Sequence, residues 1–111
     1  MQNLEGRSSR QPILEQVKRV IFRQLEGNSA KVYLFGSWAR AEEKRSSDID
    51  VAIEFPVDEP THHKLLAKIR TALEESTIPY KVDVVHMNEA DEAIVNKVKE
   101  EGILWEDRGS E

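Results

Sequence analysis

Cysteine is absent from the 111-residue sequence, which excludes disulfides, thiolate zinc sites and cysteine nucleophiles and leaves the redox compartment open. The sequence also has no apolar run long enough to cross a membrane and no signal-peptide pattern, so the cytoplasm is the default location. Basic residues are in deficit, with 16 Lys and Arg against 21 Asp and Glu and a net charge of -5. Direct binding to a nucleic-acid backbone or a membrane is therefore not expected.

Apolar residues make up 39% and charged residues 33% of the chain, and the mean hydropathy is -0.58. This balance is typical of one globular domain with a single core, and 111 residues are too few for two domains of ordinary size. The first eleven residues are polar and show no hydrophobic period. We expect a flexible N-terminal tail at 1–11, one domain at 12–107 and a C-terminal tail at 108–111.

Hydrophobic periodicity predicts three helices that alternate with three strands. The helices are expected at about 12–25, 61–75 and 89–101, and the strands at 31–35, 48–55 and 81–86. A short helical piece is expected at about 37–41, a polar loop at 42–47, and a short apolar patch at 103–105 in which Trp105 closes the core. This order indicates an α/β layer structure without internal repeats.

Two short motifs stand at the ends of the first two predicted strands. Gly36 and Ser37 follow an apolar run, and glycine suits a tight turn in which the backbone approaches a ligand. Asp48 and Asp50 begin the second strand, where side chains two residues apart share a face and lie about 7 Å apart along it. Paired carboxylates beside a turn that donates amide and hydroxyl hydrogens indicate a site for a metal-bound phosphate. Each motif alone also fits an ordinary turn, a helix cap or a turn acid.

The ordered set of Gly36, Ser37, Arg40 and the run from Ser47 to Asp50 resembles the signature of the DNA polymerase beta-like nucleotidyltransferase superfamily. Within it, the size, the spacing and the Ala-Arg pair after the turn resemble the minimal nucleotidyltransferases. The resemblance spans about 13–105, with its specific part at 36–50. Ala41 departs from the glycine that family members often have there, so the resemblance does not predict the conformation of the following loop.

The resemblance implies the nucleotidyltransferase fold, a small mixed sheet of three main strands with helices packed mainly on one face. It also implies a third carboxylate from a later strand. Asp83 is the only acid in that strand and has the parity opposite to Val82 and Val84; Glu54 is the next candidate. Asp48, Asp50 and Asp83 are then the catalytic and metal-binding residues.

The implied metal is a pair of Mg²⁺ ions, for which Mn²⁺ can substitute, because a hard ion prefers oxygen ligands. The amides around Gly36 and Ser37, with the Ser37 hydroxyl, are expected to hold the outer phosphates of ATP, helped by the positive end of the short helical piece. Arg40 and Ser47 are further candidates for nucleotide binding.

The resemblance implies transfer of AMP from ATP to a hydroxyl, with release of pyrophosphate. Minimal nucleotidyltransferases are commonly encoded with an all-helical HEPN-domain RNase toxin and act as its antitoxin by adding AMP to a tyrosine of that partner. One alternative is an antitoxin that neutralises its partner by contact alone. Another is a nucleotidyltransferase for small molecules, similar to the aminoglycoside enzymes, although those carry a further helical domain.

The remaining unusual residues are expected to be structural or solvated. His62 and His63 are neighbours at a helix start and should not face one ligand. His86 ends the third strand and is expected to be half-exposed. Trp38 either stacks on a base or packs across the turn.

Overall fold

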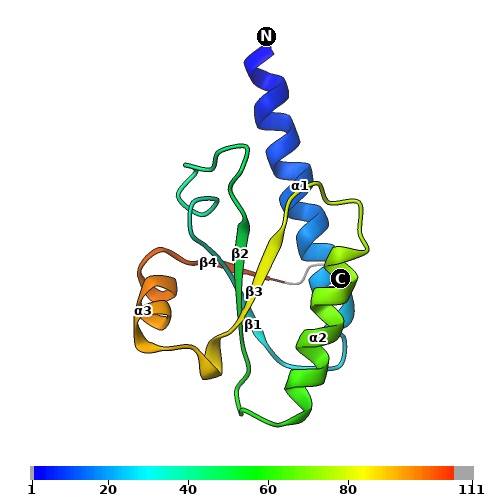
Figure 1. Cartoon of the computed structure of the whole chain (residues 1–111), viewed down its shortest axis with the longest axis vertical. Coiled ribbons are helices and arrows are strands. Elements are labelled where there is room, and N and C mark those ends of the chain that lie inside the picture. The colour runs from blue at the N-terminus through cyan, green and yellow to red at the C-terminus, as the bar shows by residue number, and fades with distance from the viewer. Residues whose placement is uncertain (1, 107–111) are drawn as a thin grey trace.

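The computed structural model describes residues 2–106, with side chains from Arg10 onward (Figure 1). In chain order, the elements are α1 (Gln2–Gln24), β1 (Lys31–Phe35), β2 (Ile49–Glu54), α2 (Thr61–Glu74), β3 (Val82–His86), the 3-10 turn η1 (Met87–Glu89), α3 (Glu92–Glu101) and β4 (Ile103–Trp105). The predicted alternation of helices and strands is confirmed, and one further short strand follows α3.

The strands form one mixed sheet in the order β3-β2-β1-β4. Strand β1 is antiparallel to both β2 and β4, whereas β2 and β3 are parallel and are joined by α2. Parallel neighbours need a crossover of this kind, because the chain must return to the same end of the sheet. Strand β4 is the segment expected to be an apolar patch, and it becomes a strand by pairing Trp105 with Val32. The predicted α/β fold class with a small mixed sheet is confirmed.

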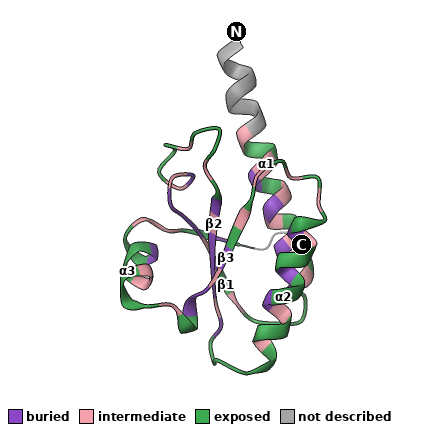
Figure 2. Ribbon diagram, viewed as in Figure 1, coloured by how far each residue is buried: buried purple, intermediate pink, exposed green. Residues whose placement is uncertain are grey.

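The helices cover the two faces of the sheet unequally (Figure 1). Helices α1 and α2 lie on one face, and both carry buried stretches (Figure 2). The core beneath them includes the fully buried side chains of Val17, Ile21, Val51 and Ile69. Trp105 belongs to this core, as expected. Helix α3 lies on the opposite face over a smaller core of buried residues: Phe35, Ala52, Met87 and Val98. The face that carries Asp50 is therefore only partly covered, and Asp83 on this face is exposed.

Helix α1 begins at Gln2, so the expected helix start at Pro12 is wrong. Pro12 lies inside the helix, where it cannot donate the usual backbone hydrogen bond to the residue four positions earlier. Gln, Glu, Leu and Arg, which are good helix formers, are frequent before it and favour the helical backbone despite the proline. The division into a tail at 1–11 and a domain from residue 12 stays a prediction, and residues 107–111 lie outside the described part. None of the helices in the described range has the length and apolar character needed to cross a membrane.

Candidate active site

The sheet brings the predicted aspartates together on the face that α3 partly covers. Asp50 in β2 and Asp83 in β3 are register partners on neighbouring parallel strands, so their side chains leave the same face side by side. Asp48 lies two residues before Asp50, just ahead of β2, and is exposed. The hydrogen bond from the Ile49 amide to the Lys81 carbonyl, 2.9 Å long, fixes this end of the two strands. Three carboxylates from two chain segments therefore converge.

The charges at this cluster are unbalanced. Asp50 is half-buried, and its pKa is raised first by burial and then by the negative charges of Asp83 and Asp48. Glu101 adds to this effect, whereas the positive charge of Lys97 opposes it. Mutual repulsion among carboxylates that offer only oxygen donors suits a hard divalent cation, which would neutralise them. The donor set therefore fits Mg²⁺ or Mn²⁺.

Gly36 brings the backbone of the turn directly against this cluster. Its φ is +78°, and a Cβ added here would lie 2.3 Å from Asp50 Oδ2. Phe35 is the register partner of Asp50, so the turn leaves β1 beside the carboxylate. No side chain fits at position 36 without moving Asp50. The approach of this backbone to a ligand stays a prediction.

The segment after Gly36 is a series of turns, and the expected short helix at 37–41 is wrong. The Gly36 carbonyl accepts from the amides of Ala39 and Arg40, and the Ser37 carbonyl accepts from Glu42 at 2.9 Å. Ala41 has a left-handed backbone with φ of 58°. A glycine adopts this conformation without the strain of about 1–2 kcal/mol that a Cβ imposes, which explains why glycine suits the position. The structure therefore offers no helix N-terminus to a phosphate here.

Glu101, the last residue of α3, accepts hydrogen bonds from two of the residues that are predicted to bind the nucleotide. The Gly36 amide donates to Glu101 Oε2 at 2.7 Å, and Arg40 Nη1 donates to Glu101 Oε1 at 3.0 Å. Desolvation alone would raise the pKa of Glu101, but the Gly36 amide, Arg40 and Lys97 outweigh it, and the pKa is lowered. Hydrogen bonds from Arg40 to Glu42 and Glu101 raise the pKa of Arg40. Because 65 residues separate Glu101 from Gly36, no sequence motif links the two.

The two serines of the predicted site lie in the surrounding loop. Ser47 Oγ accepts a hydrogen bond from the Lys44 amide at 2.8 Å, and the Ser47 carbonyl accepts from Trp38 Nε1 at 3.4 Å. Ser47 thus shapes the loop that delivers Asp48. Ser37 is half-buried in the turn beside Gly36. The roles of both serines in nucleotide binding stay predictions.

Trp38 packs across the turn, the second of its two expected roles. Its side chain is 2% exposed, and its ring meets the edge of Tyr80 at a centroid distance of 5.0 Å. Arg10 of α1 donates to the Trp38 carbonyl and pairs with Glu43 at 2.7 Å. Arg10 therefore connects α1 to the loop of the site. The sequence did not predict this contact, because residue 10 was expected to belong to a flexible tail.

A family model described as "Polymerase beta, Nucleotidyltransferase" matches residues 15–109. The chain belongs to this family. The mixed α/β fold agrees with this family. No curated protein matches the chain.

Solved structures with this fold include several toxin–antitoxin complexes. One is a toxin–antitoxin crystal structure with AMP-PNP, with 26% identity, a TM-score of 0.55, and coverage of 83% of this chain and 75% of that chain. Another contains tri-AMPylated Shewanella oneidensis HEPN toxin with MNT antitoxin, with 21% identity, a TM-score of 0.55, and coverage of 91% and 76%. The toxin–antitoxin MntA-HepT crystal structure has 21% identity, a TM-score of 0.54, and coverage of 90% and 75%. The chain therefore shares its fold with one chain in each of several solved toxin–antitoxin complexes.

Proposed function

We propose that the protein transfers AMP from ATP to a tyrosine hydroxyl of a HEPN-domain toxin, and so acts as the antitoxin of that toxin in the cytoplasm. The observation that carries the proposal is the register pairing of Asp50 with Asp83, with Asp48 beside them and the Gly36 backbone against Asp50. The solved complex with AMP-PNP and the complex with a tri-AMPylated toxin support the nucleotide and the acceptor.

In this proposal, Asp48 and Asp50 would hold two Mg²⁺ ions, and Asp83 would be a further ligand of one of them. When bound, the metal makes the α-phosphorus more electrophilic and neutralises the charge of the leaving pyrophosphate. The tyrosine oxygen forms a bond to the α-phosphorus while the bond from that phosphorus to the β-phosphate oxygen breaks. Asp83, which is exposed at the open end of the face, takes the hydroxyl proton.

In this proposal, the phosphates of ATP accept hydrogen bonds from the Gly36 amide and Arg40, which donate to Glu101 in the structure. The Gly36 amide and the Ser37 hydroxyl bind the outer phosphates, and Arg40 and Ser47 contribute further contacts. Glu101 must withdraw from Gly36 and Arg40 when a phosphate arrives, because both anions need the same hydrogens. The Glu101 carboxylate therefore marks where a negatively charged phosphate oxygen would lie.

Intact-mass spectrometry tests the proposed transfer. The protein is incubated with ATP, Mg²⁺ and a HEPN-domain toxin from the same genome, and the toxin should gain the mass of one or more AMP units. Asp50→Asn should slow transfer by at least about 10²-fold, because it removes a charged ligand on which transition-state stabilisation depends. Glu74→Gln is the control, because it removes one negative charge, as Asp50→Asn does, from an exposed residue of α2. This variant should transfer AMP normally.

Two results would contradict the transfer reaction. If wild type and Asp50→Asn neutralise the toxin equally well and no nucleoside triphosphate produces a mass shift, neutralisation occurs by contact alone. If AMP appears on an aminoglycoside and never on the toxin, the enzyme belongs with the small-molecule nucleotidyltransferases.

A further inference from the structure

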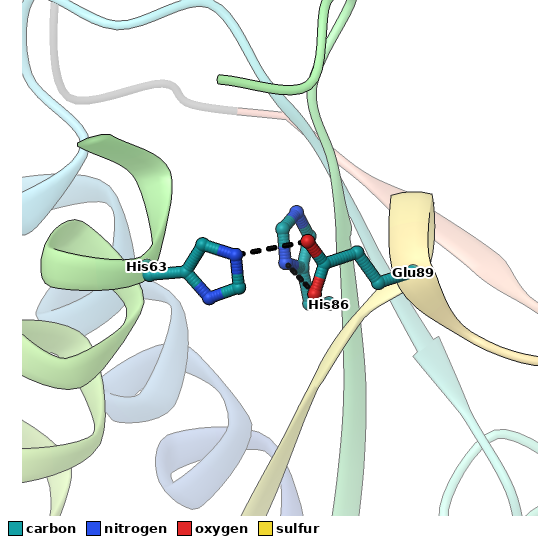
Figure 3. Close-up of side chains that lie close together, drawn as sticks. All are labelled: His63, His86 and Glu89. Atoms are coloured by element: carbon teal, nitrogen blue, oxygen red, sulfur yellow. Dashed lines mark hydrogen bonds and ion pairs between the residues drawn. The ribbon is translucent and has the colours of Figure 1, made fainter. Parts of the chain in front are cut away.

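A cluster of two histidines and a glutamate lies outside the candidate active site (Figure 3). His63 comes from the first turn of α2, His86 from the end of β3 and Glu89 from η1. The two rings meet edge-on at a centroid distance of 5.3 Å. The Glu89 carboxylate contacts both of them, with Oε2 2.8 Å from His63 Nε2 and Oε1 3.5 Å from His86 Nδ1. One potential ligand atom from each residue lies within 4.8 Å of the others, so a small shift of the exposed His63 and Glu89 side chains would bring all three onto one ion.

His86 is buried, so the expectation of a half-exposed side chain is wrong. Its side chain is only 8% exposed because the alternation along β3 turns it toward α2, where Phe55 packs edge-on against the ring. Among the described residues, neither ring nitrogen makes a hydrogen bond. Each nitrogen has a carboxylate oxygen nearby, at 3.3 or 3.5 Å, without the geometry of a hydrogen bond. A buried polar group without a hydrogen bond costs about 1–3 kcal/mol, so a ligand on Nδ1 would stabilise the fold.

The second nitrogen of His86 has its own carboxylate. Nε2 lies 3.3 Å from Asp58 Oδ1, on the side of the ring away from Glu89. Histidines that bind a metal commonly donate the other ring N–H to a carboxylate, which fixes the tautomer and the ring orientation. A metal on Nδ1 and a hydrogen bond from Nε2 to Asp58 would satisfy both nitrogens of His86.

The donor set differs from that of the aspartate cluster. Two imidazoles and one carboxylate suit Zn²⁺ and similar transition metals, whereas three carboxylates suit Mg²⁺. The two clusters are also apart. Asp83 and His86 are three positions apart on β3, which corresponds to about 10 Å along the strand and to opposite faces of the sheet.

We propose that His63, His86 and Glu89 form a Zn²⁺ site with Asp58 orienting His86. The fourth coordination position is left to water. Bound metal would tie the first turn of α2 to the end of β3, two segments that the sequence separates. His62, the neighbour of His63, is not part of the site because its ring stacks on Phe55 at a centroid distance of 3.7 Å.

Calorimetric titration with ZnCl₂ tests the site in the Asp48→Asn/Asp50→Asn background, which removes competing binding at the aspartates. One Zn²⁺ should bind per chain, and His63→Ala and Glu89→Gln should each weaken binding by at least about 10²-fold. Asp58→Asn should weaken it by about 10–100-fold, since it removes only the carboxylate behind His86. His62→Gln is the matched control and should bind Zn²⁺ normally.

Two further measurements separate metal binding from damage to the fold. Zn²⁺ should raise the thermal midpoint of the background protein and leave that of His63→Ala unchanged. Substituted Co²⁺ should give the intense visible absorption of a four-coordinate ion, and Glu89→Gln should lose it. Binding of Zn²⁺ that His63→Ala and Glu89→Gln leave unchanged, or no binding at micromolar Zn²⁺, would overturn the site.

Discussion

At the scale of single residues, Asp50 links the chemistry of the site to the stability of the fold. Burial and the charges of Asp83 and Asp48 raise its pKa above the ordinary 3.8, so the folded chain holds this proton more tightly than the unfolded chain does. The stabilising contribution of Asp50 is therefore present at acid pH and is lost as the pH rises through the folded pKa. Without metal at neutral pH, Asp50→Asn should be more stable than wild type.

Urea denaturation in EDTA across a pH series measures this difference in unfolding free energy. The advantage of Asp50→Asn should shrink as the pH is lowered toward 3.8. Mg²⁺ at neutral pH should reduce or reverse it, because the ion stabilises only the chain that binds it. An advantage that is independent of both pH and Mg²⁺ would show that the carboxylates do not repel one another.

Gly36 and Gly27 allow backbone strain to be separated from a steric clash, because both have a positive φ but only Gly36 has a neighbouring side chain in the way of a Cβ. Gly27 has φ of +82° and nothing within 4 Å of an added Cβ, whereas a Cβ on Gly36 would meet Asp50. Gly27→Ala should cost about 1–2 kcal/mol of unfolding free energy from backbone strain alone. Gly36→Ala should cost more and should also weaken Mg²⁺ binding, because Asp50 must move. Equal Mg²⁺ affinity in the two variants, measured by calorimetry, would contradict the contact.

At the scale of elements, the end of α3 lies against the turn after β1 through the hydrogen bonds of Glu101. Glu101→Gln removes the charge that competes with a phosphate for Gly36 and Arg40, so the affinity for Mg²⁺-bound AMP-PNP should rise by about tenfold. Glu100→Gln makes the same charge change at an exposed neighbouring position and is the control. If both variants bind AMP-PNP as wild type does, the nucleotide does not use these donors.

Periodicity and parity were sufficient for the elements that alternate clearly. The parity of Asp50 against Ile49 and Val51 predicted the open face, and the parity of Asp83 predicted its place there. Strand β4 was missed because it has three residues, two of them exposed, and becomes a strand only through pairing with β1. The start of α1 was missed because proline is typical of the first turn of a helix, whereas Pro12 lies inside this one.

The other omissions are long-range contacts. Glu101 reaches Gly36 across 65 residues, and Arg10 reaches Glu43 across 33. The histidine cluster forms only because the end of β3, η1 and the first turn of α2 meet in space. No local pattern records such contacts, since they arise only when the elements pack.

At the scale of the whole molecule, the core under α1 and α2 is larger than the core under α3. Local stability should therefore be lower on the α3 side of the sheet. Helix α3 buries only Val98, whereas α2 buries Leu66, Ile69 and Leu73. Native-state hydrogen exchange should show lower opening free energies for the amides of α3 than for those of β1 and β2. Val98→Ala should lower them by about 1–2 kcal/mol in α3 alone.

Ile69→Ala is the comparison on the other face of the sheet. It should reduce the global free energy of unfolding by about 2–5 kcal/mol and should affect all elements together. Identical exchange patterns for the two variants would show that both cores unfold as one unit.

The pairing of β2 with β3 has a consequence for the tolerance of the site. Backbone hydrogen bonds set the separation of the Asp50 and Asp83 backbones at the repeat of the sheet, about 4.8 Å between neighbouring strands, so only side-chain rotation can change the spacing of their carboxylates. Asp48 stands ahead of the strand and is free of that constraint. The site thus combines two aspartates whose backbones are fixed by the sheet with a third, Asp48, whose backbone is not. Ions of different radius would be accommodated mainly by the movement of Asp48, while the sheet stays unchanged.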